Sequence, residues 1–129
     1  PLPAGDWKGI RRARKAVSVP VILDESVRTP EDLDRAVGEE CCDGVNIKLA
    51  KSGIAGSAEI LRRAKNAGLK LMAGCMTETM TGLSAGIFFA AGSGHFDYVD
   101  LDGIHFLRHR SRYGPIRIAG PRFFIGEEP

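Results

Sequence analysis

The residues that decide the fold lie in the stretch 43–53, which has the sequence DGVNIKLAKSG. Its centre alternates apolar and polar side chains, so a strand predicted at 44–49 places Asn46 and Lys48 together on one face. The opposite face carries only apolar side chains. Because lysine is seldom buried without a partner, Lys48 in such a strand requires a physical explanation.

On either side of this strand, short apolar runs alternate with amphipathic stretches. Residues 20–26, PVILDES, predict a buried strand at 21–23, because the run VIL has no polar face. Thr29 is a good helix N-cap, with Pro30 in the first turn and Asp32 placed for a capping box. These signals predict a helix that ends near residue 37. Further strands are predicted at 69–74 and 96–103, and further helices at 7–17, 57–67 and 81–91.

Strict alternation of strands and helices predicts parallel strands joined by right-handed crossovers. Four strands fit either an open sheet or one half of an eight-stranded barrel. No G-x-G-x-x-G or phosphate-binding loop follows a predicted strand, which disfavours a nucleotide-binding sheet. The tail at 112–125 differs from this repeat, because Gly and Pro punctuate two short extended pieces, IRIAG and RFFIG.

Charge and composition exclude some classes of protein. The 129 residues contain 18 Lys and Arg against 16 Asp and Glu, a net charge of +2 that gives no electrostatic basis for binding nucleic acid or an anionic membrane. No apolar run reaches the roughly 18 residues of a membrane-spanning helix. Cys41, Cys42 and Cys75 form no C-x-x-C pair, and we expect reduced thiols in a cytoplasmic protein. The opening residues carry neither a signal peptide nor an initiator Met, so we expect a non-native amino end.

Polar residues gather where the predicted strands end, and chemistry in parallel β/α folds collects at these carboxyl ends. They comprise Asp24, Glu25 and Ser26 after the first strand, Asn46, Lys48 and Lys51 on and after the second, residues 74–78 after the third, and Asp100 and Asp102 on the fourth. Strand alternation predicts that the last two share a face. If the apolar faces pack on helices, Lys48 and these two aspartates point to a barrel axis.

Two interpretations of the buried Lys48 stay open at this stage. One is a structural ion pair with an aspartate. The other is a catalytic lysine with a lowered pKa, beside carboxylates that bind a cation. Asp24 likewise suits either a helix N-terminus or a Mg²⁺ site. The chain's three histidines form no metal-ligand spacing, and we expect them at the surface or at helix ends: His95, His105 and His109.

Four segments, taken in order, resemble the carboxyl half of the enolase superfamily: PVILDES, VNIKLAKSG, LMAGCMTET and YVDLDG. More narrowly, they are similar to the muconate-lactonising subgroup and its dipeptide epimerases of the L-Ala-D/L-Glu type. The 24-residue interval from Asp24 to Lys48 agrees with the family's spacing between a metal ligand and a lysine. The chain departs from the pattern at 52–54, where relatives often have two glycines.

The resemblance implies an α/β fold. Residues 1–111 would be the carboxyl half of a (β/α)₈ TIM-type barrel, strands five to eight. Residues 112–129 would return toward a capping domain, which this chain lacks together with strands one to four.

The resemblance also implies roles for the polar residues. Asp24 would be a Mg²⁺ ligand and Lys48 a catalytic acid/base. Asp100 and Asp102 would hold the α-ammonium of the substrate. The residues that line the dipeptide site would be Cys75, Met76 and Thr77.

The implied activity is Mg²⁺-dependent epimerisation of a dipeptide, by lysine-mediated proton abstraction α to a carboxylate through an enediolate. Muconate cycloisomerase, o-succinylbenzoate synthase and N-acylamino-acid racemase are alternatives, although their substrates have no free α-ammonium for the two aspartates. A non-catalytic half-barrel that needs a complementing chain is an alternative of another class. We expect as partners a dipeptide, the missing amino-terminal half and further copies in a homo-oligomer, and neither nucleic acid nor a membrane.

Overall fold

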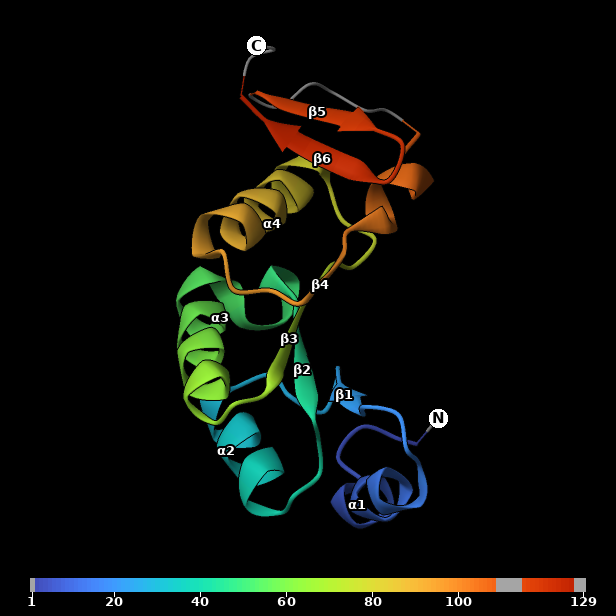
Figure 1. Cartoon of the computed structure of the whole chain (residues 1–129). Coiled ribbons are helices and arrows are strands. Elements are labelled where there is room, and N and C mark those ends of the chain that lie inside the picture. The colour runs from blue at the N-terminus through green and yellow to red at the C-terminus, as the bar shows by residue number, and fades with distance from the viewer. Residues whose placement is uncertain (1, 109–114, 127–129) are drawn as a thin grey trace.

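A parallel four-stranded sheet, in the order β1-β2-β3-β4, organises the molecule in the computed structural model, which describes residues 2–108 and 115–126 (Figure 1). The strands are β1 (Ile22–Leu23), β2 (Gly44–Ile47), β3 (Lys70–Gly74) and β4 (Tyr98–Asp100). Every neighbouring pair is parallel. The predicted alternation of strands and helices, with parallel strands, is therefore confirmed.

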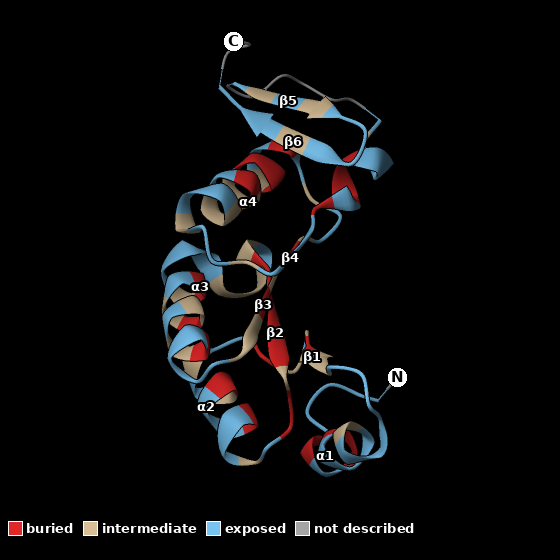
Figure 2. Ribbon diagram, in the orientation of Figure 1, coloured by how far each residue is buried: buried red, intermediate tan, exposed pale blue. Residues whose placement is uncertain are grey.

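The helices that connect successive strands are α2 (Pro30–Gly38), α3 (Leu49–Asn66) and α4 (Met80–Ser93), and α1 (Trp7–Ala16) precedes β1. Figure 1 shows α2, α3 and α4 along the same side of the strands, so helices cover one face of the sheet. The buried core lies between this helical layer and the sheet. All four residues of β2 are buried, whereas all three of β4 are exposed (Figure 2).

The helix signals that depend on neighbouring residues are confirmed. The Thr29 hydroxyl accepts a hydrogen bond from the Asp32 amide at 3.1 Å, and the Asp32 carboxylate accepts one from the Thr29 amide at 2.9 Å. This capping box begins α2, with Pro30 in its first turn. The three cysteines are free thiols, and Cys41 and Cys42 are buried in the core.

Three predicted boundaries are wrong. The strand predicted at 44–49 ends at Ile47, and Lys48 is the N-cap of α3. That helix begins eight residues before the predicted 57, and Gly53 interrupts it with φ 67° and ψ 174°, a conformation that glycine adopts readily. The strand predicted at 96–103 ends at Asp100, and residues Asp102–Phe106 form the 3₁₀ helix η1. Strand alternation therefore does not place Asp102 on the face that carries Asp100.

The tail forms an antiparallel hairpin of β5 (Ile116–Ala119) and β6 (Arg122–Ile125), which confirms two short extended pieces. Ile118 and Phe123 of this hairpin pack against Met80, Leu83 and Ile104. The boundary predicted at residue 111 and the histidine His109 lie outside the described residues. His95 and His105 are exposed, as predicted.

Within 2–108 and 115–126, no helix is both long enough and apolar enough to cross a membrane.

Candidate active site

The polar residues singled out in the sequence follow strands that end at one edge of the sheet. Asp24 follows β1 directly, Lys48 follows β2, and Cys75 follows β3. The strand register pairs Leu23 with Val45, Ile47 with Ala73, and Gly74 with Asp100, so the strand ends lie side by side. The topology thus brings into contact side chains from neighbouring strand ends, such as Lys48 and Met76, which are 28 positions apart in the sequence.

Asp24 is the centre of this edge. Its Oδ2 accepts a hydrogen bond from Asn46 Nδ2 at 3.0 Å and lies 2.8 Å from Lys48 Nζ, while its Oδ1 lies 2.8 Å from Lys51 Nζ. Burial by itself raises the pKa of Asp24, but the hydrogen bonds from Lys48 and Lys51 outweigh burial and hold its pKa below the ordinary value. Asp24 is therefore a carboxylate anion with both oxygens engaged.

Lys48 forms an ion pair with Asp24 and a second with Glu25 at 3.3 Å, so the ion pair with an aspartate, one of the two interpretations left open by the sequence, is present. Burial lowers the pKa of Lys48, but its hydrogen bonds to the two carboxylates and their negative charges raise it above its ordinary value. The lowered pKa assumed in the catalytic interpretation is therefore wrong for this arrangement, because the hydrogen bond and charge of Asp24, added to by those of Glu25, outweigh burial. In this geometry Lys48 is held protonated, as a proton donor.

Lys51 is a member of this cluster that the sequence left without a role. Its Nζ donates to the Asp24 carbonyl oxygen at 2.7 Å, to Asp24 Oδ1 at 2.8 Å and to the Asn46 carbonyl oxygen at 2.9 Å. Its side chain is only 3% exposed, and burial lowers its pKa. A lysine in the first turn of a helix, three residues after a buried lysine, is the signal that could have identified it.

The segment after β3 lies beside the same ammonium. Met76 Sδ is 3.9 Å from Lys48 Nζ, and Cys75 Sγ accepts a hydrogen bond from the Gly103 amide at 3.4 Å. Burial raises the pKa of the Cys75 thiol, which keeps it neutral. Thr77 is exposed. The contact with Gly103 joins this segment to η1, and so to the chain that follows β4.

Asp100 and Asp102 are both exposed. Asp100 lies at the end of β4 and Asp102 opens η1. In the part of the chain that the structure describes, neither carboxylate takes part in an ion pair, and neither is the aspartate that Lys48 binds. Two unpaired acidic groups at the strand ends suit a cationic group of a ligand.

The donor set of this edge fits Mg²⁺ only in part. Mg²⁺ requires near-octahedral oxygen coordination, commonly with one or two carboxylates and several waters. The described residues contain no group of three or more His, Cys, Asp or Glu side chains placed to hold a metal. Asp24, with its pKa lowered and its side chain 30% exposed, has the chemistry of one such ligand. The remaining oxygen ligands would have to come from outside these residues.

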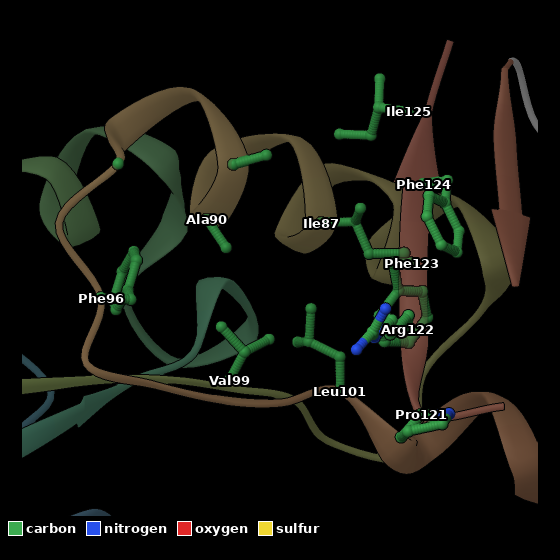
Figure 3. Close-up of a pocket in the computed structure, with 12 residues that line it drawn as sticks. Ile87, Ala90, Phe96, Val99, Leu101, Pro121, Arg122, Phe123, Phe124 and Ile125 are labelled. Atoms are coloured by element: carbon green, nitrogen blue, oxygen red, sulfur yellow. The ribbon is translucent and has the colours of Figure 1, made fainter. Parts of the chain in front are cut away.

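A separate apolar cavity of about 560 Å³ lies between α4, β4 and β6 (Figure 3). Its lining includes Ile87, Phe96, Val99, Leu101 and Phe123, and none of the predicted site residues. The polar chemistry of the chain is therefore at the strand ends and not in this cavity.

The whole chain, residues 1–129, matches the family model described as Enolase C-terminal domain-like, and the chain belongs to this family. The L-Ala-D/L-Glu epimerase of Thermotoga maritima is 40% identical over 128 residues, which cover 99% of this chain and 37% of that relative. The chain spans little more than a third of the length of this relative. Its sheet corresponds to the C-terminal barrel part of such proteins.

Two solved structures extend the comparison. The substrate-liganded complex of the L-Ala-D/L-Glu epimerase from Bacillus subtilis has a TM-score of 0.92 and 31% identity, covering 100% of this chain and 36% of that one. The dipeptide epimerase from Enterococcus faecalis V583, complexed with Mg and the dipeptide L-Leu-L-Tyr, has a TM-score of 0.84 and 29% identity, covering 91% of this chain and 34% of that one. The relatives are thus isomerases of dipeptides, and one structure holds Mg and a dipeptide together.

Proposed function

We propose that this chain is the second half of the catalytic barrel of a Mg²⁺-dependent dipeptide epimerase, of the L-Ala-D/L-Glu type. The observation that carries the proposal is the partly buried Asp24–Lys48 ion pair of 2.8 Å at the carboxyl edge of a parallel sheet. A carboxylate for a hard cation and an ammonium that can carry a proton stand there in direct contact. The match of the whole chain to epimerases supports the same activity.

In this proposal Lys48 moves the proton at the α-carbon of the substrate. As an ammonium held by Asp24 and Glu25 it donates a proton, and it becomes a base only after it leaves them, because their charges raise its pKa. Bound Mg²⁺ would supply electrophilic stabilisation of the charge that develops on the substrate carboxylate. Asp24 would be one of its ligands. A second lysine on the opposite face, from the missing half, would complete an epimerisation.

Asp100 and Asp102 bind the substrate's α-ammonium in this proposal, since both are exposed and unpaired among the described residues. Cys75, Met76 and Thr77 line the dipeptide site, with Met76 beside Lys48. The acidic pair favours a dipeptide over the substrates of a muconate cycloisomerase, an o-succinylbenzoate synthase or an N-acylamino-acid racemase. None of those substrates offers a free ammonium.

The unpaired edges of the sheet support the proposed domain organisation. In the described chain β1 and β4 each have one neighbour, and β4 is exposed along its length, with Val99 at 55%. Open edges and exposed apolar strand residues are normally covered. Residues 1–111 would complete a barrel with strands one to four, and residues 112–129 would pack toward a capping domain. We propose a cytoplasmic homo-oligomer of the complete protein.

The experiment measures α-proton exchange in D₂O by ¹H NMR with a panel of L,L-dipeptides, on the complete protein with Mg²⁺. We expect Lys48→Ala to abolish exchange while Mg²⁺ still binds, because its ammonium is not a metal ligand. Lys65→Ala, an exposed lysine on α3, is the matched control and should keep wild-type exchange. No exchange with any dipeptide, together with turnover of a cycloisomerase substrate, would refute the assignment.

A separate experiment tests the alternative that this chain alone is a non-catalytic half-barrel. The purified 129-residue chain should not epimerise any dipeptide, because it has one lysine and one metal ligand of the proposed set. Mg²⁺-dependent epimerisation by this chain alone would contradict the proposed division of the site.

A further inference from the structure

Two lysines contact Asp24, and their surroundings differ. Lys51 Nζ has three acceptors within 2.9 Å, two of which are backbone carbonyl oxygens, of Asp24 and Asn46. An ammonium has three N–H donors, so every donor of Lys51 is used. Its partners are fixed parts of β2 and of the residue that follows β1. Lys51 therefore has no donor left for a substrate and cannot leave without breaking three bonds.

Lys48 has a different set of partners. It contacts Asp24 Oδ2 at 2.8 Å, Glu25 at 3.3 Å and the Met76 sulfur at 3.9 Å, all of them side chains. Glu25 is exposed, and its side chain is 47% accessible. None of these contacts involves a backbone acceptor, and a side-chain partner can rotate away. Of the two ammonium groups, Lys48 is thus the one that can separate from Asp24.

Asn46 provides a third donor to the same carboxylate. Its Nδ2 donates to Asp24 Oδ2, and its own Oδ1 is buried without a hydrogen-bond partner. Turning the amide over would place Oδ1 against the carboxylate oxygen, so the orphan acceptor results from the donor that Asp24 requires. A buried unpaired acceptor costs free energy. The unpaired acceptor is present nevertheless, which indicates that the hydrogen bond from Asn46 helps to fix the orientation of Asp24 at Oδ2.

The contacts of Asp24 can be compared with the number of acceptor sites on its two carboxylate oxygens. A carboxylate offers about four acceptor sites, two on each oxygen. Lys51 occupies one on Oδ1 and Asn46 one on Oδ2, and Lys48 takes a second one on Oδ2. When Lys48 leaves, Oδ2 is the oxygen that gains a free site, while Lys51 and Asn46 still hold the carboxylate plane.

We propose that Lys51 is a positioning residue for Asp24, which fixes Oδ1 so that Oδ2 is presented to a divalent cation. This inference rests on the proposed function. It assigns the two lysines different tasks, with Lys48 as the catalytic residue and Lys51 as a fixed tether between the ends of β1 and β2. Residues that orient a metal ligand commonly change metal affinity 10- to 100-fold when they are removed.

The direction in which Mg²⁺ affinity changes when Lys51 is removed distinguishes a positioning role from a simple effect of its positive charge. If Lys51 acted only as a nearby positive charge, its removal would tighten Mg²⁺ binding, because repulsion of the cation would fall. If Lys51 positions Asp24, its removal weakens Mg²⁺ binding, because the carboxylate then rotates toward Lys48 as its remaining ammonium partner.

The test titrates Mg²⁺ into the complete protein by isothermal calorimetry, without substrate. Lys51→Met should raise the dissociation constant for Mg²⁺ by about 10- to 100-fold. Lys65→Met removes an exposed ammonium from the same helix and should leave the constant within twofold of wild type. At saturating Mg²⁺, the kcat of Lys51→Met should return to within a few-fold of wild type, because Lys48 is intact.

An unchanged or smaller dissociation constant in Lys51→Met would overturn the proposal, as would loss of kcat that saturating Mg²⁺ does not restore. Lys51→Arg serves if Lys51→Met does not fold, because it keeps the charge but cannot direct three bonds from one atom. Its dissociation constant should also rise, and an unchanged value would overturn the proposal. If neither variant folds, Lys51 serves stability alone and the positioning role is rejected.

Asp24→Asn separates this inference from the proposed function. If Asp24→Asn leaves Mg²⁺ binding unchanged, the proposed metal ligand is wrong and the function proposal fails with it. If Asp24→Asn weakens binding and Lys51→Met does not, only the positioning role fails.

Discussion

The substitution Gly74→Ala tests how tightly the Asp24 cluster is packed. Gly74 ends β3, and a Cβ built on it would lie 2.4 Å from Asn46 Oδ1 and 2.7 Å from Asn46 Nδ2. Real Cβ contacts are essentially never shorter than 3.0 Å, so the Asn46 amide must retreat by about 1 Å to reach ordinary contact. Only glycine leaves room for this amide beside Asp24.

The expected cost follows from the hydrogen bond that this retreat breaks. The Asn46–Asp24 bond is 3.0 Å long, and a displacement of about 1 Å takes it out of hydrogen-bonding range. A hydrogen bond to a charged group contributes about 1.5–3 kcal/mol, and overpacking costs about 1–3 kcal/mol where the neighbours cannot move. We expect the free energy of unfolding to fall by about 2–3 kcal/mol.

The assay is urea denaturation of the complete protein, followed by circular dichroism. Gly92→Ala is the matched control, because Gly92 lies in α4 and a Cβ there would meet nothing within 4 Å. Alanine is favoured over glycine inside a helix, so the control should be unchanged or more stable by up to about 1 kcal/mol. If Gly74→Ala is within about 0.5 kcal/mol of this control, the Asn46 amide has another place to go and the packing argument is refuted.

The remaining predictions concern stability away from the site. The hydrogen bond from Arg14, followed by that from the Val21 amide, lowers the pKa of Asp43. Stability from this carboxylate is therefore complete above the unfolded pKa of about 3.9 and is lost as the pH falls through the lower folded value. Asp43→Asn should flatten the acid limb of a plot of melting temperature against pH, and an unaltered limb would contradict this. Thr29→Ala removes the capping box of α2 and should cost about 1 kcal/mol in urea denaturation, whereas an effect below about 0.3 kcal/mol would show the cap to be dispensable.

What the sequence predicted depends on the range of the interactions involved. Thr29 and Asp32 are three residues apart, and their capping box was predictable because every group in it is local. The parallel strands were predictable from the alternation of apolar runs and amphipathic stretches. The 3₁₀ turn that opens at Asp102 was missed because alternation continues in the letters VDLD after the strand has ended.

The partners of the lysines lie beyond that local range. Lys51 is 27 residues from Asp24. Only the register of β1 against β2 brings the Lys51 ammonium to both the carbonyl oxygen and the carboxylate of Asp24. The expected direction of the Lys48 pKa shift was wrong for the same reason. Burial predicts a lowered pKa, and a nearby carboxylate predicts the reverse, so the sign depends on which partners the fold supplies.

The structural and catalytic interpretations of Lys48 are compatible because of the charge balance at this edge. Two carboxylates, Asp24 and Glu25, face the two ammonium groups of Lys48 and Lys51, so the charges of the cluster balance, with the lysines buried and Glu25 at its exposed rim. Removing one member would leave an uncompensated charge, which is strongly unfavourable in a protein interior. Under the proposed function, a cation at Asp24 would add positive charge to this balance. Lys48, the member held only by side chains, would then be the one released, and the loss of its carboxylate partners would lower its pKa toward that of a base. In the observed arrangement the ion pair with Asp24 raises the pKa of Lys48 and keeps it protonated.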